Sequence, residues 1–112
     1  MKVTETFFSI DVIDMKRATA FYVDAFGARV SAALPFWSSL HVAGVRIGLF
    51  LHPQHSPGRI GLHFVVDDLA EACEGVVRAG GRIVEAPREV APNVIVADVA
   101  DTEGNVIAVR GP

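Results

Sequence analysis

The sequence predicts an α+β fold in which one strand-helix-three-strand module, βαβββ, occurs twice in tandem. The first observation behind this prediction is an internal repeat. Displacing the chain by 54 positions aligns residues of similar polarity over much of its length. The aligned pairs include Phe8 with Leu62, Ile10 with Phe64, Asp14 with Asp68, Ala18 with Ala72, Gly27 with Gly81 and Val30 with Val84. Near the end of each copy the register resumes at an offset of 60, where Gly44 pairs with Gly104.

The second observation is a strand followed by a capped helix at the start of the first copy. Phe8, Ile10 and Val12 alternate with polar residues, which is typical of a strand with one buried face. Asp14 is a predicted helix N-cap, and Gly27 is predicted to end that helix. Between them, the apolar residues Met15, Ala18, Phe21, Tyr22, Ala25 and Phe26 follow helical spacing.

The second copy repeats this pattern. Asp68 and Glu71 resemble a capping box, and Gly80 and Gly81 follow the apolar stripe of the predicted helix. The third observation is the turn chemistry that separates three strands after each helix. The predicted strands are about 29–34, 37–43 and 45–51 in the first copy and about 82–86, 93–100 and 105–110 in the second.

The repeat divides one domain of residues 1–112 into three parts. Module one is residues 1–52 and module two is residues 60–112. Residues 53–59, PQHSPGR, have the Pro, Gly and polar content of a linker. We therefore expect two similar modules that share one globular unit.

Composition limits the classes of function. The chain has 112 residues, 51% of them hydrophobic, which is enough for a sizeable core. A net charge of -3 without runs of like charge gives no basis for binding nucleic acid or anionic membranes. No signal peptide or span of about 20 apolar residues is present, so we expect a cytoplasmic protein. Cys73 is the only cysteine, and we interpret it as a packed helix residue.

Three segments give the sequence a family resemblance. They are IDVIDMKRATAFYVDAFGARV in module one, and FVVDDLAEACEGVVRAGGRIV and the terminal DTEGNVIAV in module two. With them the whole chain resembles the vicinal oxygen chelate superfamily, which includes glyoxalase I, extradiol dioxygenases, fosfomycin-resistance enzymes and bleomycin-resistance proteins. The resemblance implies a curved mixed sheet around a cup, with helices on the outer face, and a homodimer. The ending departs from the usual family pattern at Thr102 and Ala108.

The same resemblance implies where a metal would bind. Metal-using members of the superfamily take ligands from the first and last strand of each module. Transferred through the repeat, these four positions hold Phe7, Gly48, Gly61 and Ala108. None of these side chains can donate to a metal ion. We therefore expect no metal and no other cofactor. His63 lies two residues beyond the ligand position in its strand.

Strand parity directs a set of aromatic and polar side chains into the cup. These candidate ligand-binding residues are Phe7, Trp37, Ser39, His41, Arg46, Phe50 and His63. Alternatives remain for several of them. His41 and His63 are either ligand contacts or hydrogen-bonded wall residues, and a displaced metal site with Asp11 is a third interpretation. The aromatic residues either stack on a ligand or fill the floor of the cup.

Arg46 also has two interpretations. As an inward guanidinium it needs an anionic partner, either Asp11 or a carboxylate or phenolate of a ligand. Alternatively, its long side chain reaches water at the rim of the cup.

These residues favour a metal-independent protein that binds a small aromatic or planar molecule, similar to sequestration proteins of the bleomycin-resistance type. The alternative is an enzyme, either a glyoxalase-like lyase or isomerase or a dioxygenase, that uses a displaced metal or metal-free acid-base residues. No catalytic residue is assigned by the sequence. The expected partners are a small-molecule ligand and a second copy of the chain.

Overall fold

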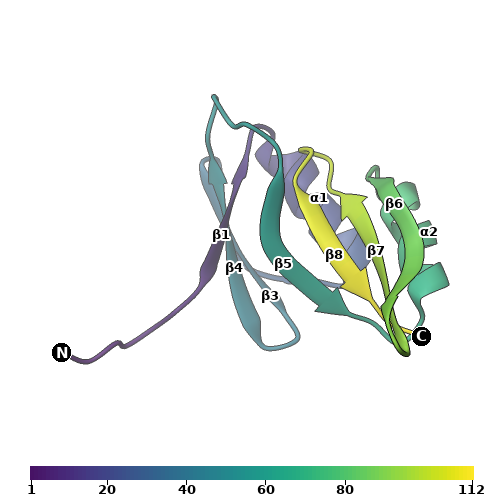
Figure 1. The fold of residues 1–112 in the computed structure, drawn as a ribbon. Helices are drawn as coiled ribbons and strands as arrows, with labels where there is room; N and C mark the ends of the chain where they lie inside the picture. Colours follow the sequence, from purple (N-terminus) through teal and green to yellow (C-terminus); the bar gives the residue numbers. More distant parts are fainter.

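The computed structural model describes residues 1–112 and contains two βαβββ modules (Figure 1). Module one consists of β1 (Phe8–Val12), α1 (Met15–Phe26), β2 (Arg29–Leu34), β3 (Trp37–Val42) and β4 (Val45–Leu51). Module two consists of β5 (Arg59–Val65), α2 (Leu69–Arg78), β6 (Arg82–Ala91), β7 (Val94–Ala100) and β8 (Val106–Arg110). The predicted fold class and the duplicated order of elements are confirmed. Only β6 is much longer than predicted, because it continues in a hairpin with β7 to Ala91.

Both helices begin where the sequence predicted. The side chain of Asp14 accepts a hydrogen bond from the backbone nitrogen of Arg17 at 3.1 Å, and Asp68 accepts one from Glu71 at 3.0 Å. Helix α1 ends at Gly27, whose φ of 65° is the left-handed conformation that glycine adopts without a steric penalty. Neither helix is long and apolar enough to cross a membrane.

Each module forms its own four-stranded sheet. The strand order is β1-β4-β3-β2 in module one and β5-β8-β7-β6 in module two. In each sheet the first strand runs parallel to the last, and the remaining neighbours are antiparallel. Strands β1 and β5 therefore each keep one edge without a partner. Within one chain the eight strands do not join into a single sheet.

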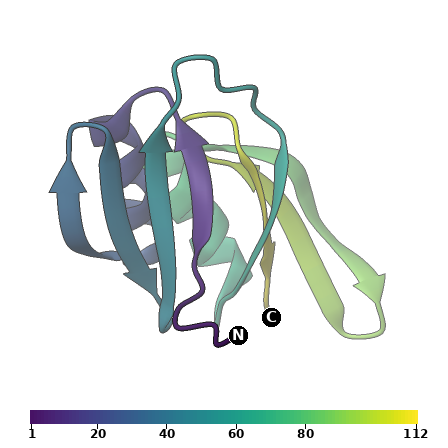
Figure 2. The same ribbon diagram turned by 90° about the vertical axis from the view of Figure 1, so that its left-hand side faces the viewer.

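The two helices lie together in the angle between the two sheets (Figures 1 and 2). They share one hydrophobic core, in which Phe21 and Tyr22 of α1 pack with Val76 of α2 and Val99 of β7. The packing is close at Gly81, where an added Cβ would lie 2.7 Å from the ring of Phe21. A larger residue at this position would therefore push the modules apart.

A buried polar turn after β7 joins the modules. Asp101 is 4% exposed, and its Oδ1 accepts hydrogen bonds from the backbone nitrogens of Glu103 and Asn105 at 2.8 and 2.9 Å. Its Oδ2 accepts from the hydroxyl of Tyr22 at 2.5 Å and from Nδ2 of Asn105 at 3.0 Å. One carboxylate thus shapes the turn in module two and holds a helix of module one.

Glu103 extends this contact to the start of α1. Its Oε2 accepts hydrogen bonds from the backbone nitrogens of Ile13 and Asp14 at 2.7 and 3.2 Å. Its Oε1 pairs with the guanidinium of Arg17 at 2.8 Å. An acidic side chain beside the unpaired N–H groups of a helix start is favourable. The terminal segment DTEGN therefore fixes how module two sits on module one.

This packing directs the other faces of the sheets away from each other. The face of each sheet that the helices cover packs against the common core. We call the opposite face of each sheet its open face. The two open faces point outward in different directions (Figures 1 and 2). The open face of module one carries Trp37, Arg46 and Phe50, and that of module two carries His63 and Asp98. The predicted helix-covered sheets are present, but one chain does not close a cup around both open faces.

We predict that Tyr22 ionises at higher pH than an ordinary tyrosine. Burial, assisted by the charge of Asp101, raises the pKa of Tyr22 well above its usual value of 10.0. The unfolded chain releases this proton first, so the free energy of unfolding decreases as the pH rises above about 10. Tyr22 is the only tyrosine, so tyrosinate absorbance of the folded protein measures this group alone.

The Tyr22→Phe variant provides the comparison. It should lose about 1–3 kcal/mol of stability at neutral pH, because Asp101 loses a donor, and its stability should decline less above pH 10. Urea unfolding at a series of pH values measures both effects. Lys16→Gln, an exposed change on the same helix, should stay within about 0.5 kcal/mol of the parent. A tyrosinate transition near pH 10 in the folded protein would contradict the prediction.

Candidate functional site

The open face of module one brings together six of the seven predicted ligand-binding residues. Antiparallel pairing of β3 with β4 places Trp37 opposite Phe50 and His41 opposite Arg46. Alternation along each strand puts these side chains on the face away from α1. The rings of Trp37 and Phe50 are half-buried and lie 6.3 Å apart, centroid to centroid. The face is thus an aromatic surface with a cation beside it.

Arg46 is held by contacts on several sides. The centre of its guanidinium lies 4.6 Å from the ring centroid of Phe7 and 5.7 Å from that of Trp37. Its Nε donates to Oγ of Ser39 at 3.0 Å, and its Nη1 pairs with Oε1 of Glu5 at 2.6 Å. The anionic partner is therefore Glu5, and no contact with Asp11 is formed. Stacking on two aromatic rings orients a cation and keeps its outer N–H groups available.

His41 has a polar neighbour on the adjacent strand. Its Nε2 lies 3.1 Å from Oγ of Ser31 on β2. The hydroxyl of Ser31 also donates to the carbonyl of Ser39 at 3.2 Å. This arrangement corresponds to the hydrogen-bonded wall residue, which was one of the three sequence interpretations of His41.

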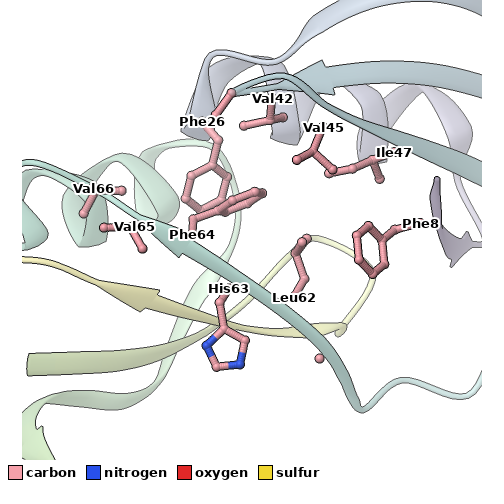
Figure 3. Close-up of a pocket in the computed structure, with 12 residues that line it drawn as sticks. Phe8, Phe26, Val42, Val45, Ile47, Leu62, His63, Phe64, Val65 and Val66 are labelled. Carbon is pink, nitrogen blue, oxygen red and sulfur yellow. The ribbon is translucent and has the colours of Figure 1, made fainter. Parts of the chain in front are cut away.

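His63 does not join this group. It lies on β5, and its imidazole points away from Leu62 and Phe64, on the opposite side of the strand (Figure 3). Its direction follows the predicted strand parity, but its sheet is not the one that carries Trp37 and Arg46. His63 lies apart from Trp37 and Arg46 because the two modules pack through their helices, and this packing turns the open face of module two away from that of module one.

The residues at the family's metal-ligand positions do not fit a metal ion. Phe7, Gly48, Gly61 and Ala108 offer no nitrogen, oxygen or sulfur donor from their side chains. At Gly48 the space is also occupied, since an added Cβ would lie 2.7 Å from Cε2 of Phe50. The Phe50 ring therefore covers the position from which a ligand side chain would project. Within one chain, no three His, Cys, Asp or Glu side chains are grouped so that they would hold a metal ion.

The open face of module two carries a charged cluster that the sequence interpretation missed. Asp98 of β7 is 2% exposed, and its Oδ2 pairs with Nη2 of Arg59 at 2.7 Å and with Nη2 of Arg88 at 3.2 Å. The hydrogen bond from Arg59, with the charges of both guanidinium groups, lowers the pKa of Asp98 against the opposing effect of burial. The one feature of the sequence that could have indicated this cluster is Asp98 itself, the only charged residue in the strand VIVADVA.

A separate apolar cleft lies between the modules. It has a volume of about 590 Å³ and is lined mainly by hydrophobic side chains (Figure 3). Phe8, Val45 and Ile47 of module one face Leu62 and Phe64 of module two across it. These side chains belong to the helix-covered sides of β1, β4 and β5. The cleft is therefore distinct from both open faces.

Comparison with known proteins identifies the family. Residues 7–109 match the Glyoxalase/Bleomycin resistance protein/Dioxygenase superfamily. The match spans nearly the whole chain, and the chain belongs to this superfamily. The resemblance found in the sequence is thereby confirmed.

Solved structures of similar fold include proteins of several functions. TnmS3, an antibiotic binding protein from Streptomyces sp. CB03234, is 29% identical with a TM-score of 0.74 over 100% of this chain and 98% of its own. The fosfomycin resistance protein FosX from Listeria monocytogenes is 17% identical with a TM-score of 0.82 over 100% and 95%. Lactoylglutathione lyase from Agrobacterium tumefaciens is 18% identical with a TM-score of 0.75 over 99% and 96%. The likeness to the last two concerns the fold alone. No curated protein matches the chain.

We predict that Gly48→Ala displaces the ring of Phe50. The new methyl group would lie 2.7 Å from Cε2, too close for two carbon atoms, so the ring must shift relative to Trp37. Trp37 is the only tryptophan, and its emission spectrum should shift. In a Phe50→Ala background the same Gly48→Ala change should leave the spectrum unchanged. Equal spectral shifts in both backgrounds would show that Phe50 does not fill this space.

Proposed function

We propose that this protein binds a small aromatic or planar molecule without a metal, with the open face of module one as the aromatic half of the site. The supporting observation is the group formed by Arg46, Trp37 and Phe50, together with Phe7 from the N-terminal segment. A planar ligand stacked on these rings removes apolar surface from water at about 25 cal/mol per Å². The antibiotic-binding relative TnmS3 supports a binding function over a catalytic one.

The lack of side-chain donors at the four family positions supports metal independence. Phe50 also supports metal independence, since its ring occupies the space above Gly48. A second candidate function, a lyase, isomerase or dioxygenase of this superfamily, needs a displaced metal or acid-base residues. His41 beside Ser31 is the one arrangement that favours acid-base chemistry on this face.

We also propose a homodimer in which module one of one chain meets module two of the other. Strands β1 and β5 each have a free edge, which favours pairing with another strand. Large apolar side chains are exposed near these edges, including Phe8 at 58% and Val65 at 77%. Pairing β1 of one chain with β5 of a second would set the two kinds of open face against each other. Each cup would then combine residues of both chains.

We predict that planar aromatic compounds raise the melting temperature of the protein, because a ligand that binds only the folded state stabilises it. Trp37→Ala should weaken binding of the best compound about tenfold, through lost stacking and apolar contact. Val77→Ala, an exposed change on α2, is the control and should have no effect. Isothermal titration calorimetry measures these affinities.

Metal analysis tests the rival function. Protein purified without chelator should contain less than a stoichiometric amount of Ni, Zn, Fe or Mn. One equivalent of metal that is lost in His63→Ala would overturn the metal-independent proposal.

We predict that Phe8→Asp shifts the protein from a dimer to a monomer of 12.0 kDa. A charge at this apolar edge must be desolvated in the proposed interface, and that penalty opposes association. The control is Val77→Asp, because Val77 is 55% exposed, close to the value for Phe8. Light scattering after gel filtration measures the mass, and circular dichroism checks that both variants are folded. A Phe8→Asp protein that remains dimeric would contradict this interface.

A further inference from the structure

Asp98 occupies a central place on the open face of module two. Strand pairing sets it opposite Ala108 of β8, and Ala108 lies opposite His63 of β5. The three residues form a row across the sheet. Ala108 is small, so the row has a depression between the imidazole and the carboxylate. A cavity of about 320 Å³ lies here, lined by both residues.

Two cations stand over this single buried carboxylate. Arg59 and Arg88 both pair with Oδ2 of Asp98, and Arg88 also pairs through Nε with Glu85 at 3.2 Å. Arg88 donates from Nη1 to the carbonyl of Val96 at 3.2 Å, so three of its nitrogens are engaged. Arg88 is therefore a fixed part of the wall.

Arg59 is different, because most of its donors are free. Its only side-chain partner is Asp98, reached through Nη2, and its side chain is 65% exposed. A guanidinium has five N–H donors in a planar fork. Asp98 thus holds one edge of Arg59 and leaves the other edge available. A carboxylate that approaches this edge forms two parallel charge-assisted hydrogen bonds.

The remaining walls of the cavity are apolar. They are formed by the side chains of Val90, Val96, Val106 and Ala108. An inorganic anion would meet the guanidinium but gain nothing from these walls, and a neutral aromatic molecule would leave the guanidinium unused. The combination of one cationic edge with hydrophobic walls selects an organic anion. The volume suits a small ligand of one or two rings.

We infer that this cavity is an anion-binding subsite and that the ligand is an aromatic carboxylate, with its carboxylate on Arg59 and its ring against the apolar wall. Asp98 is a positioning residue that fixes the guanidinium. The inference rests on the proposed small-molecule binding function and adds the chemical class of the ligand. In the proposed dimer this subsite faces the aromatic half of the cup.

The test compares 2-naphthoate with 2-naphthamide, which have the same ring but differ in charge. Binding is followed by two-dimensional NMR of the backbone amides of Arg59, His63 and Ala108. Naphthoate should bind at least about tenfold more tightly than naphthamide, as one charge-assisted hydrogen-bonded pair is worth that ratio or more. Arg59→Gln should remove this preference and leave naphthamide affinity unchanged. Arg78→Gln removes the same charge from α2 and should preserve the preference.

Each outcome decides one of the two proposals. If both probes bind equally, or if Arg59→Gln keeps the preference, the anion subsite is wrong and the binding function stands. If neither probe binds and no planar aromatic compound raises the melting temperature, the binding function fails and the subsite with it. Arg59→Lys keeps the charge without the planar fork and should retain part of the preference. If Arg59→Gln does not fold, a reduced preference in Arg59→Lys supports the subsite, and an undiminished preference overturns it.

Discussion

The arrangement of this protein depends on the buried contact between the turn at Asp101 and helix α1. Asp101 has no cationic partner, and hydrogen bonds from Tyr22, Asn105 and the turn backbone stabilise its carboxylate. Glu103 adds contacts to the backbone and side chain at the start of α1. Together these buried hydrogen bonds hold the turn against α1, which leaves little freedom in how the modules pack.

That orientation determines which side chains can act together. The helices occupy the angle between the sheets, so the open faces are divided between two directions (Figure 2). Module one offers aromatic rings and the stacked guanidinium of Arg46, and module two offers His63 and the pair of Arg59 with Asp98. In the proposed dimer the two kinds of face complement each other, one by stacking and one by binding an anion.

Local charge on the open faces differs from the charge of the whole chain. The net charge is -3, yet Arg46, Arg59 and Arg88 all lie on the open faces. Asp98 and Glu5 partly neutralise these cations and also orient them. Net charge therefore predicted the absence of large anionic partners, such as nucleic acid, but carried no information about a small anionic ligand.

The sequence alone determined the two modules, the helix caps and the face of each strand, because these depend on local periodicity and on residues close in the chain. Asp14, Gly27 and Asp68 act as their sequence positions predict. Only the tertiary structure decided that His63 lies apart from Trp37 and Arg46, that Glu5 pairs with Arg46, and that Arg59 and Arg88 converge on Asp98. The ion pairs join residues that are 10 to 41 positions apart in the chain. The place of His63 depends on how the two modules pack. The separation of His63 follows from how the helices share one core, and the ion pairs follow from which strands and segments lie side by side; strand periodicity encodes neither.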